Sequence, residues 1–219
     1  MQQNTTKVNY QLELDNIIKN LEQENKVPTL LLHSCCGPCS SYVVTYLKNY
    51  FDLTVFFYNP NIFPREEYDH RLSEQTRLLK ELNIPLLEIG YDHSEYLSYV
   101  KGLEEEPEGG ARCSKCFELR LRKTYELAKE RHFDYCCTTL TVSPHKNAML
   151  INKIGQQLYE EFLPINNINN FNIMPLWLPS DFKKREGYKK SVELSKQYHL
   201  YRQDFCGCEF AYRGSEKAE

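Results

Sequence analysis

The sequence lacks the segments that would direct it into or across a membrane. Residues 1–26 are polar and acidic, without the apolar core of a secretory signal peptide, and no apolar run anywhere approaches the length of a membrane-spanning helix. We therefore expect a cytoplasmic protein that has no membrane partner. Internal repeats and low-complexity segments are also absent, and 219 residues are enough for one α/β domain with a large core.

An excess of basic charge is missing as well. Twenty-seven Lys and Arg stand against 30 Asp and Glu, and the resulting net charge of −3 argues against a broad nucleic-acid-binding surface. Local patches remain open: the run 183–190 carries five basic residues and a tyrosine, and is either a grip for a phosphate backbone or a solvated helix face. Four arginines flank the cysteines and could add phosphate contacts: Arg112, Arg120, Arg122 and Arg202.

Cysteine, by contrast, is abundant. The chain has nine cysteines, an odd number, and in a reducing compartment a disulfide scaffold is not expected. Metal binding or redox chemistry is then the leading explanation. The cysteines fall into four groups: Cys35, Cys36 and Cys39; Cys113 and Cys116; Cys136 and Cys137; Cys206 and Cys208.

The hydrophobic pattern alternates between strand-like and helix-like segments. Apolar runs predict strands at about 30–34, 53–58, 85–89 and 135–140, and helical periodicity predicts helices at about 9–25, 42–47, 65–82, 96–101, 113–131, 141–158 and 183–197. Parallel strands need crossover connections, so this alternation indicates an α/β protein with a Rossmann-like parallel sheet. The Asn- and Pro-rich stretch 164–179 gives no assignable pattern.

The first cysteine group lies where the first strand turns into a helix. The segment LLLHSCCGPCS ends an apolar run with three cysteines within five residues, followed by a proline that suits a helix start. Ligands of open α/β sheets bind beyond the carboxyl ends of the strands. We therefore expect the functional site at this turn.

Cys113 and Cys116 are spaced to share one face of the first turn of a helix, where the helix dipole stabilises thiolates. Together with Cys35 and Cys36 they supply the four thiolates of a [4Fe–4S] cluster or of an all-cysteine zinc site. Spacing does not choose between these, but zinc sites usually pair two similar CxxC knuckles. The unequal CC plus CxxC arrangement therefore favours iron and sulfur.

The remaining cysteines differ in their expected roles. In Cys206-Gly207-Cys208 the glycine frees the backbone, so that the two sulfurs can approach disulfide geometry or share a metal. Cys39 is either a further ligand or a free thiol. Cys136 and Cys137 fall inside a predicted strand, where cysteine ordinarily packs as a small apolar residue. For His33, a structural hydrogen bond is at least as good an explanation as metal ligation.

Several segments in the same order resemble the cobalamin-independent epoxyqueuosine reductases, the QueH family. They are LLHSCCGPCS, FFYNPNIFP, EPEGGARCSKCFELRLRKTYELA, TTLTVSPHKN, DFKKREGY and LYRQDFCGC. The resemblance covers residues 27–210. It leaves 1–26 as an N-terminal helical extension and 211–219 as a C-terminal tail.

The resemblance implies a HUP-type Rossmann-like domain that carries a [4Fe–4S] cluster and reduces epoxyqueuosine to queuosine at the wobble position of tRNA, the last step of queuosine biosynthesis. It implies Cys35, Cys36, Cys113 and Cys116 as cluster ligands, and Cys206 and Cys208 as catalytic residues that form a redox-active pair or hold a second, mononuclear iron. An external electron donor is required. The chain departs from the family pattern at Phe63, Phe205 and the pair Cys136-Cys137, which leaves these ligands in place.

Two other functions remain as alternatives. A HUP-fold tRNA-thiolating enzyme would use ATP, but the turn after the first strand has cysteines where such enzymes carry a glycine-rich SGGxDS phosphate loop. A zinc-stabilised nucleic-acid-binding module without catalysis would hold one tetrahedral zinc, and the low basic charge counts against it.

Overall fold

The computed structural model describes residues 8–163 and 174–211. Within them, five parallel strands form one sheet in the order β3-β2-β1-β4-β5. The strands are β1 (Thr29–Ser34), β2 (Asp52–Phe57), β3 (Leu86–Glu88), β4 (Tyr135–Thr138) and β5 (Leu176–Trp177). This is the strand order of a Rossmann-type sheet. The predicted α/β class is confirmed.

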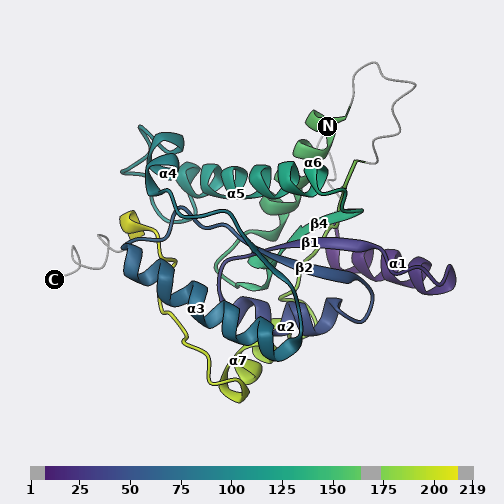
Figure 1. Cartoon of the computed structure of the whole chain (residues 1–219). Coiled ribbons are helices and arrows are strands. Elements are labelled where there is room, and N and C mark those ends of the chain that lie inside the picture. Colours follow the sequence, from purple (N-terminus) through teal and green to yellow (C-terminus); the bar gives the residue numbers. More distant parts are fainter. Residues whose placement is uncertain (1–7, 164–173, 212–219) are drawn as a thin grey trace.

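Helices cover both faces of the sheet (Figure 1). One layer contains α4 (His93–Tyr99), α5 (Ala111–Glu130) and α6 (Ala148–Phe162), and the opposite layer contains α2 (Gly37–Leu47), α3 (Arg65–Leu82) and α7 (Gly187–Gln197). Helix α1 (Tyr10–Gln23) begins at the cap Asn9, whose side chain accepts a hydrogen bond from Leu12 N. The predicted amphipathic N-terminal helix is confirmed, with Leu14, Ile18 and Leu21 buried.

The core has two halves because successive strand residues point to opposite faces. On β1, Leu31 packs in the cluster beneath α5 and α6, whereas Leu30 and Leu32 pack with α1 and α2. On β4, Cys136 packs in the same cluster as Leu31, and Cys137 packs in the cluster of Leu30 and Leu32. Their exposed fractions are 1% and 0%. The structural interpretation of this pair, as small apolar core residues, is confirmed.

Three predicted boundaries are wrong, each for a local reason. The strand expected at 135–140 ends at Thr138, because the Thr138 hydroxyl accepts from Leu140 N and starts the 3-10 turn η1 (Thr139–Val142). The helix expected from 141 begins only at Ala148, after the cap Asn147. The helix expected at 96–101 spans His93–Tyr99, because Asp92 caps its start.

The basic helix is also shorter than predicted. Arg185 and Glu186 have φ angles of 51° and 60°, which lie outside the helical region. The helix α7 therefore begins only at Gly187. A Cβ atom at Gly187 would lie 1.7 Å from the Phe182 carbonyl oxygen, so this glycine permits a close backbone approach. It therefore starts the helix.

Parts of other predictions fall on residues that the structure does not describe. These are residues 1–7 of the expected extension, residues 164–173 of the unassigned stretch, and residues 212–219 of the expected tail. Of the unassigned stretch, the described part contributes the edge strand β5.

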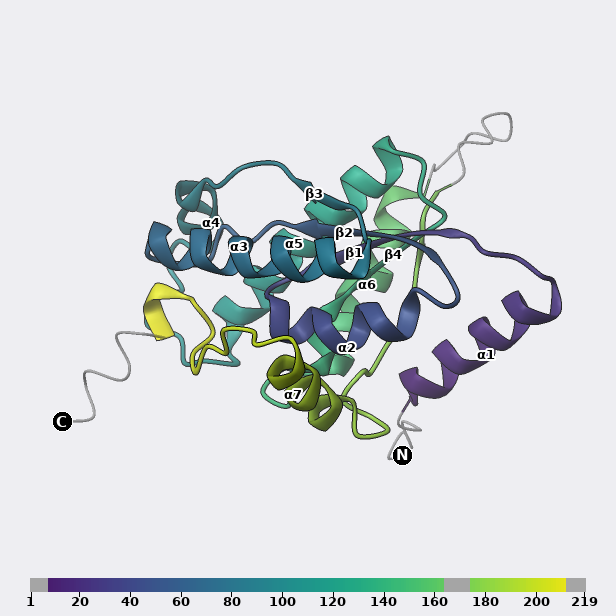
Figure 2. The same cartoon turned by 60° about the horizontal axis from the view of Figure 1, so that its bottom comes forward.

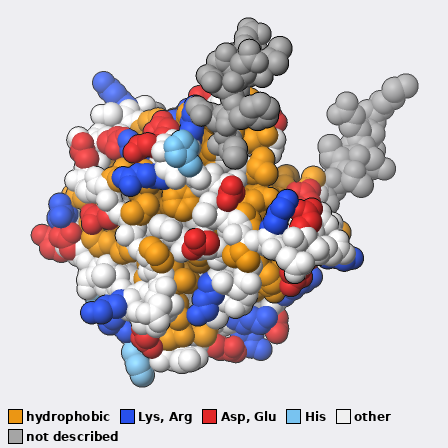
Figure 3. Space-filling model, turned by 45° about the vertical axis from the view of Figure 1, so that its right-hand side comes forward, with side chains coloured by type: hydrophobic (Ala, Val, Ile, Leu, Met, Phe, Trp, Pro, Cys, Tyr) orange, Lys and Arg blue, Asp and Glu red, His pale blue; other side chains and the backbone are white. Residues whose placement is uncertain are grey.

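No helix in the two described ranges is both long and apolar enough to cross a membrane. On the face shown in Figure 3, basic and acidic side chains alternate with apolar ones. That distribution agrees with the net charge of −3.

Candidate functional site

Three thiols gather at the turn between β1 and α2. Cys35 and Cys36 follow the last residue of β1, and Cys39 lies one helical turn further on, where Ser40 N donates to the Cys36 carbonyl over 3.1 Å. The sulfur atoms of Cys35, Cys36 and Cys39 all lie within 4.8 Å of one another, the one such group of potential metal ligands in the described part of the chain. The turn predicted from the sequence is therefore a thiol cluster, and Cys39 belongs to it.

The three thiols do not ionise alike. Hydrogen bonds from Cys36 and Cys39 hold the pKa of Cys35 well below its usual value, and the positive charges of Lys146 and Arg120 lower it further. The interaction with Cys35 raises the pKa of Cys36 to about 12, and it also raises that of Cys39. The Cys35 and Cys36 sulfurs are 3.7 Å apart. Without a metal, the negative charge of the group is thus concentrated on Cys35, whereas a bound metal would require each ligating cysteine to lose its proton.

Hydrogen bonds between buried polar side chains hold the turn between β1 and α2 in place. Ser34 and Ser40 both donate to Gln75 Oε1 of α3, over 2.9 and 3.0 Å. Asn59 Nδ2, in the loop after β2, donates to the Ser34 carbonyl over 2.8 Å. All four side chains are buried. The backbone that carries the thiols is therefore held by two other elements, α3 and the loop after β2, which limits its freedom to move.

A buried guanidinium lies close to the cysteines. Arg120 of α5 is 2% exposed, and its Nε donates to the Cys116 carbonyl over 3.2 Å while Nη1 reaches Asn59 Oδ1 at 3.4 Å. Burial alone would lower the pKa of Arg120, but nearby Cys116, Cys206 and Cys35 raise it. Its Nη2 is buried without a hydrogen-bond partner. This positive charge suits an anionic metal–thiolate centre.

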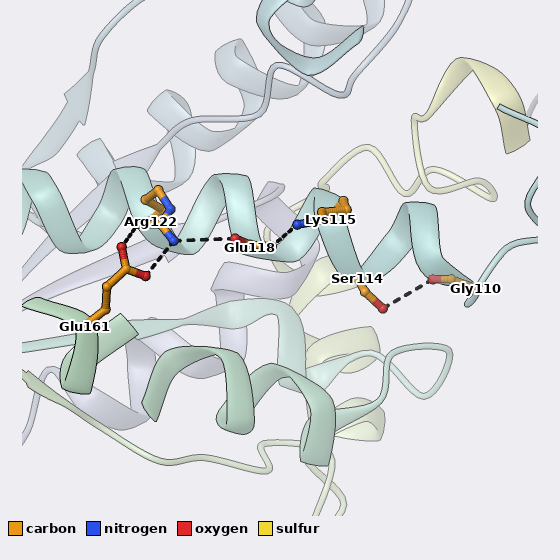
Figure 4. A network of polar contacts seen from close by, with 6 residues as sticks. All are labelled: Gly110, Ser114, Lys115, Glu118, Arg122 and Glu161. Atoms are coloured by element: carbon orange, nitrogen blue, oxygen red, sulfur yellow. Dashed lines mark hydrogen bonds and ion pairs between the residues drawn. The ribbon is translucent and has the colours of Figure 1, made fainter. Parts of the chain in front are cut away.

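Cys113 and Cys116 lie in the first turns of α5, as predicted. Gly109 N donates to the Cys113 sulfur over 3.2 Å, and burial raises the pKa of Cys116 to about 12. An ion-pair network on the outer side of the helix, shown in Figure 4, links Lys115, Glu118 and Arg122, and Arg122 joins α5 to Glu161 of α6 at 2.6 Å. The Arg122–Glu161 pair thus links α5, which presents both cysteines, to α6.

Cys113 and Cys116 do not belong to the 4.8 Å group, but they pack in the same core cluster as the thiols of the turn. Cys206 and Cys208 belong to that cluster as well. The seven cysteines outside β4 thus converge from three segments of the chain. Which of them bind a shared metal centre stays a prediction.

The segment that carries Cys206 and Cys208 runs along α3 to the start of that helix (Figures 1 and 2, yellow). Ile62 and Cys208 form an isolated antiparallel bridge, and Phe63 N donates to the Gly207 carbonyl over 2.8 Å. Gly207 has a φ of +92°, a conformation that L side chains rarely adopt. The Tyr96 hydroxyl lies 3.1 Å from the Cys208 sulfur. Cys208 is buried and Cys206 is partly exposed.

A cavity of about 500 Å³ opens beside these thiols. Cys39 and Cys206 both line it, together with the cations Lys146 and Arg202 and the ring of Tyr188. Burial opposes a charge on Lys146, but Cys206, Cys35 and Cys39 raise its pKa. Two carboxylates, Glu108 and Asp204, line the cavity as well, so a ligand there would face two thiols and side chains of both charge signs.

Histidine takes no part in the thiol cluster. His33 is fully buried, with Nδ1 2.9 Å from the Thr138 hydroxyl and Nε2 3.1 Å from the Tyr58 carbonyl. Burial and the charge of Arg120 lower its pKa to about 3, so that the ring is neutral. Its hydrogen bonds join β1 to β2 and β4, and the structural interpretation of His33 is confirmed.

Of the four arginines expected near phosphates, one lines the cavity. Arg202 does so, whereas Arg122 is engaged in the α5–α6 ion pairs. The prediction is wrong for Arg112 and Arg120, which are 3% and 2% exposed. Arg112 donates to the carbonyls of Leu103, Glu104 and Glu106 and so ties the loop before α5 to the helix.

Lys146 is the main residue that the motif analysis missed. It follows the 3-10 turn after β4, the strand that pairs with β1. Neighbouring parallel strands deliver their carboxyl ends to one edge of the sheet, so this position signals the site once the strand order is known.

The chain matches a known protein family over most of its length. The family model "Epoxyqueuosine reductase QueH" matches residues 30–214. Proteins of that name from Streptococcus pyogenes and Staphylococcus epidermidis are 42% and 40% identical to this chain. Each match covers 94% of this chain, and the matches cover 78% and 85% of the two relatives. A solved structure, the U34-tRNA thiolase NcsA from Methanococcus maripaludis with its [4Fe-4S] cluster, has a TM-score of 0.48 at 14% identity, over 94% of this chain and 71% of that one. On the family model and the sequence identities, the chain belongs to the epoxyqueuosine reductase QueH family.

Proposed function

We propose that this chain reduces epoxyqueuosine to queuosine at the wobble position of tRNA, in the cytoplasm, as the last step of queuosine biosynthesis. Membership of the QueH family gives the activity. The observation that supports this chemistry is the cavity lined by Cys39, Cys206, Lys146 and Arg202, beside the thiol cluster to which Cys39 belongs.

The cofactor that fits is a [4Fe–4S] cluster. We assign Cys35, Cys36, Cys113 and Cys116 as its ligands, because they are thiols of one buried cluster that comes from two helix starts. The unpartnered Nη2 of Arg120 supports an anionic group there. When bound, such a cluster supplies electrons one at a time. Cys39, within the same 4.8 Å group, is the alternative ligand.

The reaction needs a source of two electrons and two protons. Removal of the epoxide oxygen breaks two C–O bonds, forms a C=C bond, and releases the oxygen as water. The thiols of Cys206 and Cys208 can supply both electrons and both protons by forming one disulfide, which an external electron donor must then reduce. The alternative is that Cys206 and Cys208 hold a mononuclear iron. In both versions Cys206 lines the cavity where the epoxide would lie.

The positive side chains of the cavity have a separate role. As the C–O bonds break, negative charge develops on oxygen, and Lys146 and Arg202 are the cavity cations that would stabilise it. Tyr188 lines the same cavity and offers a ring for stacking on the base. A wobble base in a single-stranded loop leaves its stack at modest cost, which allows it to enter.

The RNA backbone would follow the basic segment 183–190. A second cavity, lined by Lys183, Lys184 and Tyr10, adjoins the first, since Lys146 and Tyr188 line both. Lys184, Lys189 and Lys190 are exposed, and Lys183 pairs with Asp181 at 2.7 Å. The position of Lys183 and Lys184 in the second cavity supports the phosphate-binding interpretation for the start of the run.

Neutralising Lys183, Lys184, Lys189 and Lys190 to glutamine should weaken tRNA binding by about 10-fold or more and flatten its salt dependence. Each lost phosphate contact reduces the slope of log affinity against log salt by about 0.7 to 0.9. Binding is measured by fluorescence anisotropy at several salt concentrations. Glutamine at Lys19, Lys48, Lys80 and Lys153, four exposed lysines outside both cavities, is the matched charge control. An unchanged slope in the fourfold variant would contradict this path for the RNA.

The first test of the function combines metal analysis and turnover on protein purified without oxygen. About four irons and four sulfides with broad visible absorption, and conversion of epoxyqueuosine in tRNA by a chemical reductant, are expected. A fifth iron would favour metal binding by Cys206 and Cys208. Zinc without sulfide and without turnover would overturn the proposal and favour the nucleic-acid-binding module. ATP-dependent sulfur transfer would favour the thiolating enzyme.

A further inference from the structure

The loop of Cys206 and Cys208 is held by a buried arginine. Arg71 of α3 is 2% exposed. Its Nη1 donates to the Cys206 carbonyl over 3.1 Å and its Nη2 to the Phe205 carbonyl over 3.4 Å, while the guanidinium lies 5.2 Å from the centre of the Phe205 ring. One side chain therefore binds the two peptide groups that immediately precede Gly207.

The guanidinium is itself held in place. Its Nε donates to Glu67 Oε1 over 2.6 Å, one helical turn earlier on α3. Glu67 also accepts from the Tyr201 hydroxyl, at 3.3 Å from Oε2. The ion pair is almost fully buried, with side-chain exposures of 2% and 12%. A buried charge pair with satisfied partners has a fixed geometry, since any displacement leaves a charge uncompensated.

The conformation of Gly207 fits closely against this arginine. A Cβ atom at Gly207 would lie 2.9 Å from Arg71 Nη1, and the φ of +92° is already unfavourable for other residues. On the opposite side of the loop, Phe63 N donates a hydrogen bond to the Gly207 carbonyl. The loop is thus clamped between α3 and the segment after β2, so its two thiols have a set direction.

We propose that Arg71 is a positioning residue of the reductase, which sets the direction of the Cys206 and Cys208 thiols toward the substrate cavity and the buried cysteines. This inference rests on the proposed function for the role of the two thiols. The contacts themselves do not depend on it. Arginine suits this position better than lysine, because its Nε, Nη1 and Nη2 bind three different oxygens, whereas the three N–H groups of lysine diverge from a single nitrogen.

The test uses Arg71→Lys and the double variant Glu67→Gln/Arg71→Met. The double variant removes both members of the ion pair, so it leaves no buried unpaired charge and should fold. Both variants should keep their iron content and visible absorption, lower kcat by 10-fold or more, and leave KM for the tRNA within about 2-fold. Rates of alkylation of Cys206 and Cys208 by iodoacetamide, measured by peptide mass spectrometry, should change by at least 3-fold.

Arg77→Lys is the matched control. Arg77 lies on the same helix, pairs with Glu74 at 3.0 Å, and donates to two successive carbonyls, Tyr198 and His199, outside the cysteine cluster. Its replacement should leave kcat and the alkylation rates unchanged. Full kcat and wild-type alkylation in both Arg71 variants would overturn the proposal and leave Arg71 a purely structural residue.

The alkylation measurement separates this inference from the proposed function. If the wild-type protein shows no reductase activity but the alkylation rates shift in the Arg71 variants, the positioning role holds and the function fails. If turnover is present and neither rates nor kcat respond to Arg71, the function holds and the positioning role fails.

Discussion

Serine in place of Cys206 should abolish turnover, lowering kcat by a factor on the order of 1,000 or more, as expected when one member of a catalytic unit is removed. The cavity and its cations would remain, because the change removes one sulfur from a partly exposed side chain. The visible absorption of the cluster should be unchanged. Single-turnover conversion of epoxyqueuosine in tRNA, followed by nucleoside analysis, measures the loss.

The matched control for this variant is Cys137→Ser. Cys137 is fully buried on the opposite face of the sheet, and its sulfur donates to the Leu178 carbonyl at 3.3 Å, a bond that a hydroxyl can replace. It should keep wild-type turnover. If Cys206→Ser instead loses the cluster absorption, then Cys206 is one of the cluster ligands and the set proposed above is incorrect.

Serine in place of Cys35 should eliminate the iron–sulfur centre altogether. Cys35 has the lowered pKa of the thiol group and is the thiolate around which Cys36 and Cys39 gather. Serine is a harder ligand that does not ionise near neutral pH, so it is a poor replacement for a thiolate on iron. Iron and sulfide content should fall to background, and turnover should fall with them.

Two further variants decide the ligand set in the same measurement. Cys113→Ser should lose the cluster, whereas Cys39→Ser should keep it. The reverse result would show that the centre is built on Cys35, Cys36 and Cys39, the three sulfurs that already lie within 4.8 Å of one another. The spectroscopic signature of each variant distinguishes a lost cluster from an altered one.

The fold and the position of the site could be predicted from the sequence because both rest on local patterns. The β1 turn is an apolar run followed by three cysteines and a proline, and α5 carries its cysteines at helical spacing from its first turn. Such signals need no tertiary information. The neighbouring positions of β1 and β4 then follow from the rules for parallel sheets.

The parts that could not be predicted depend on contacts between distant residues. Lys146 faces the cavity only because the 3-10 turn delays the start of α6 to Ala148. Arg120 looks from its sequence like a solvent-facing helix cation, and it is buried by the convergence of β1, β2 and α5 around it. Arg71 contacts Cys206 across 135 residues of chain. No periodicity in the sequence carries that information.

The late position of Cys206 and Cys208 in the chain has a consequence for biosynthesis. Domains generally fold as units during synthesis. The four strands β1 to β4 and the thiol turn are all encoded before residue 143, whereas the loop that Arg71 holds is translated more than 60 residues later. The Arg71–Glu67 pair therefore lacks the two carbonyls that it binds in the finished protein until synthesis is almost complete. A chain that ended before residue 205 would keep the thiol turn and α5, but it would leave the buried Arg71 guanidinium without two of its hydrogen-bond acceptors.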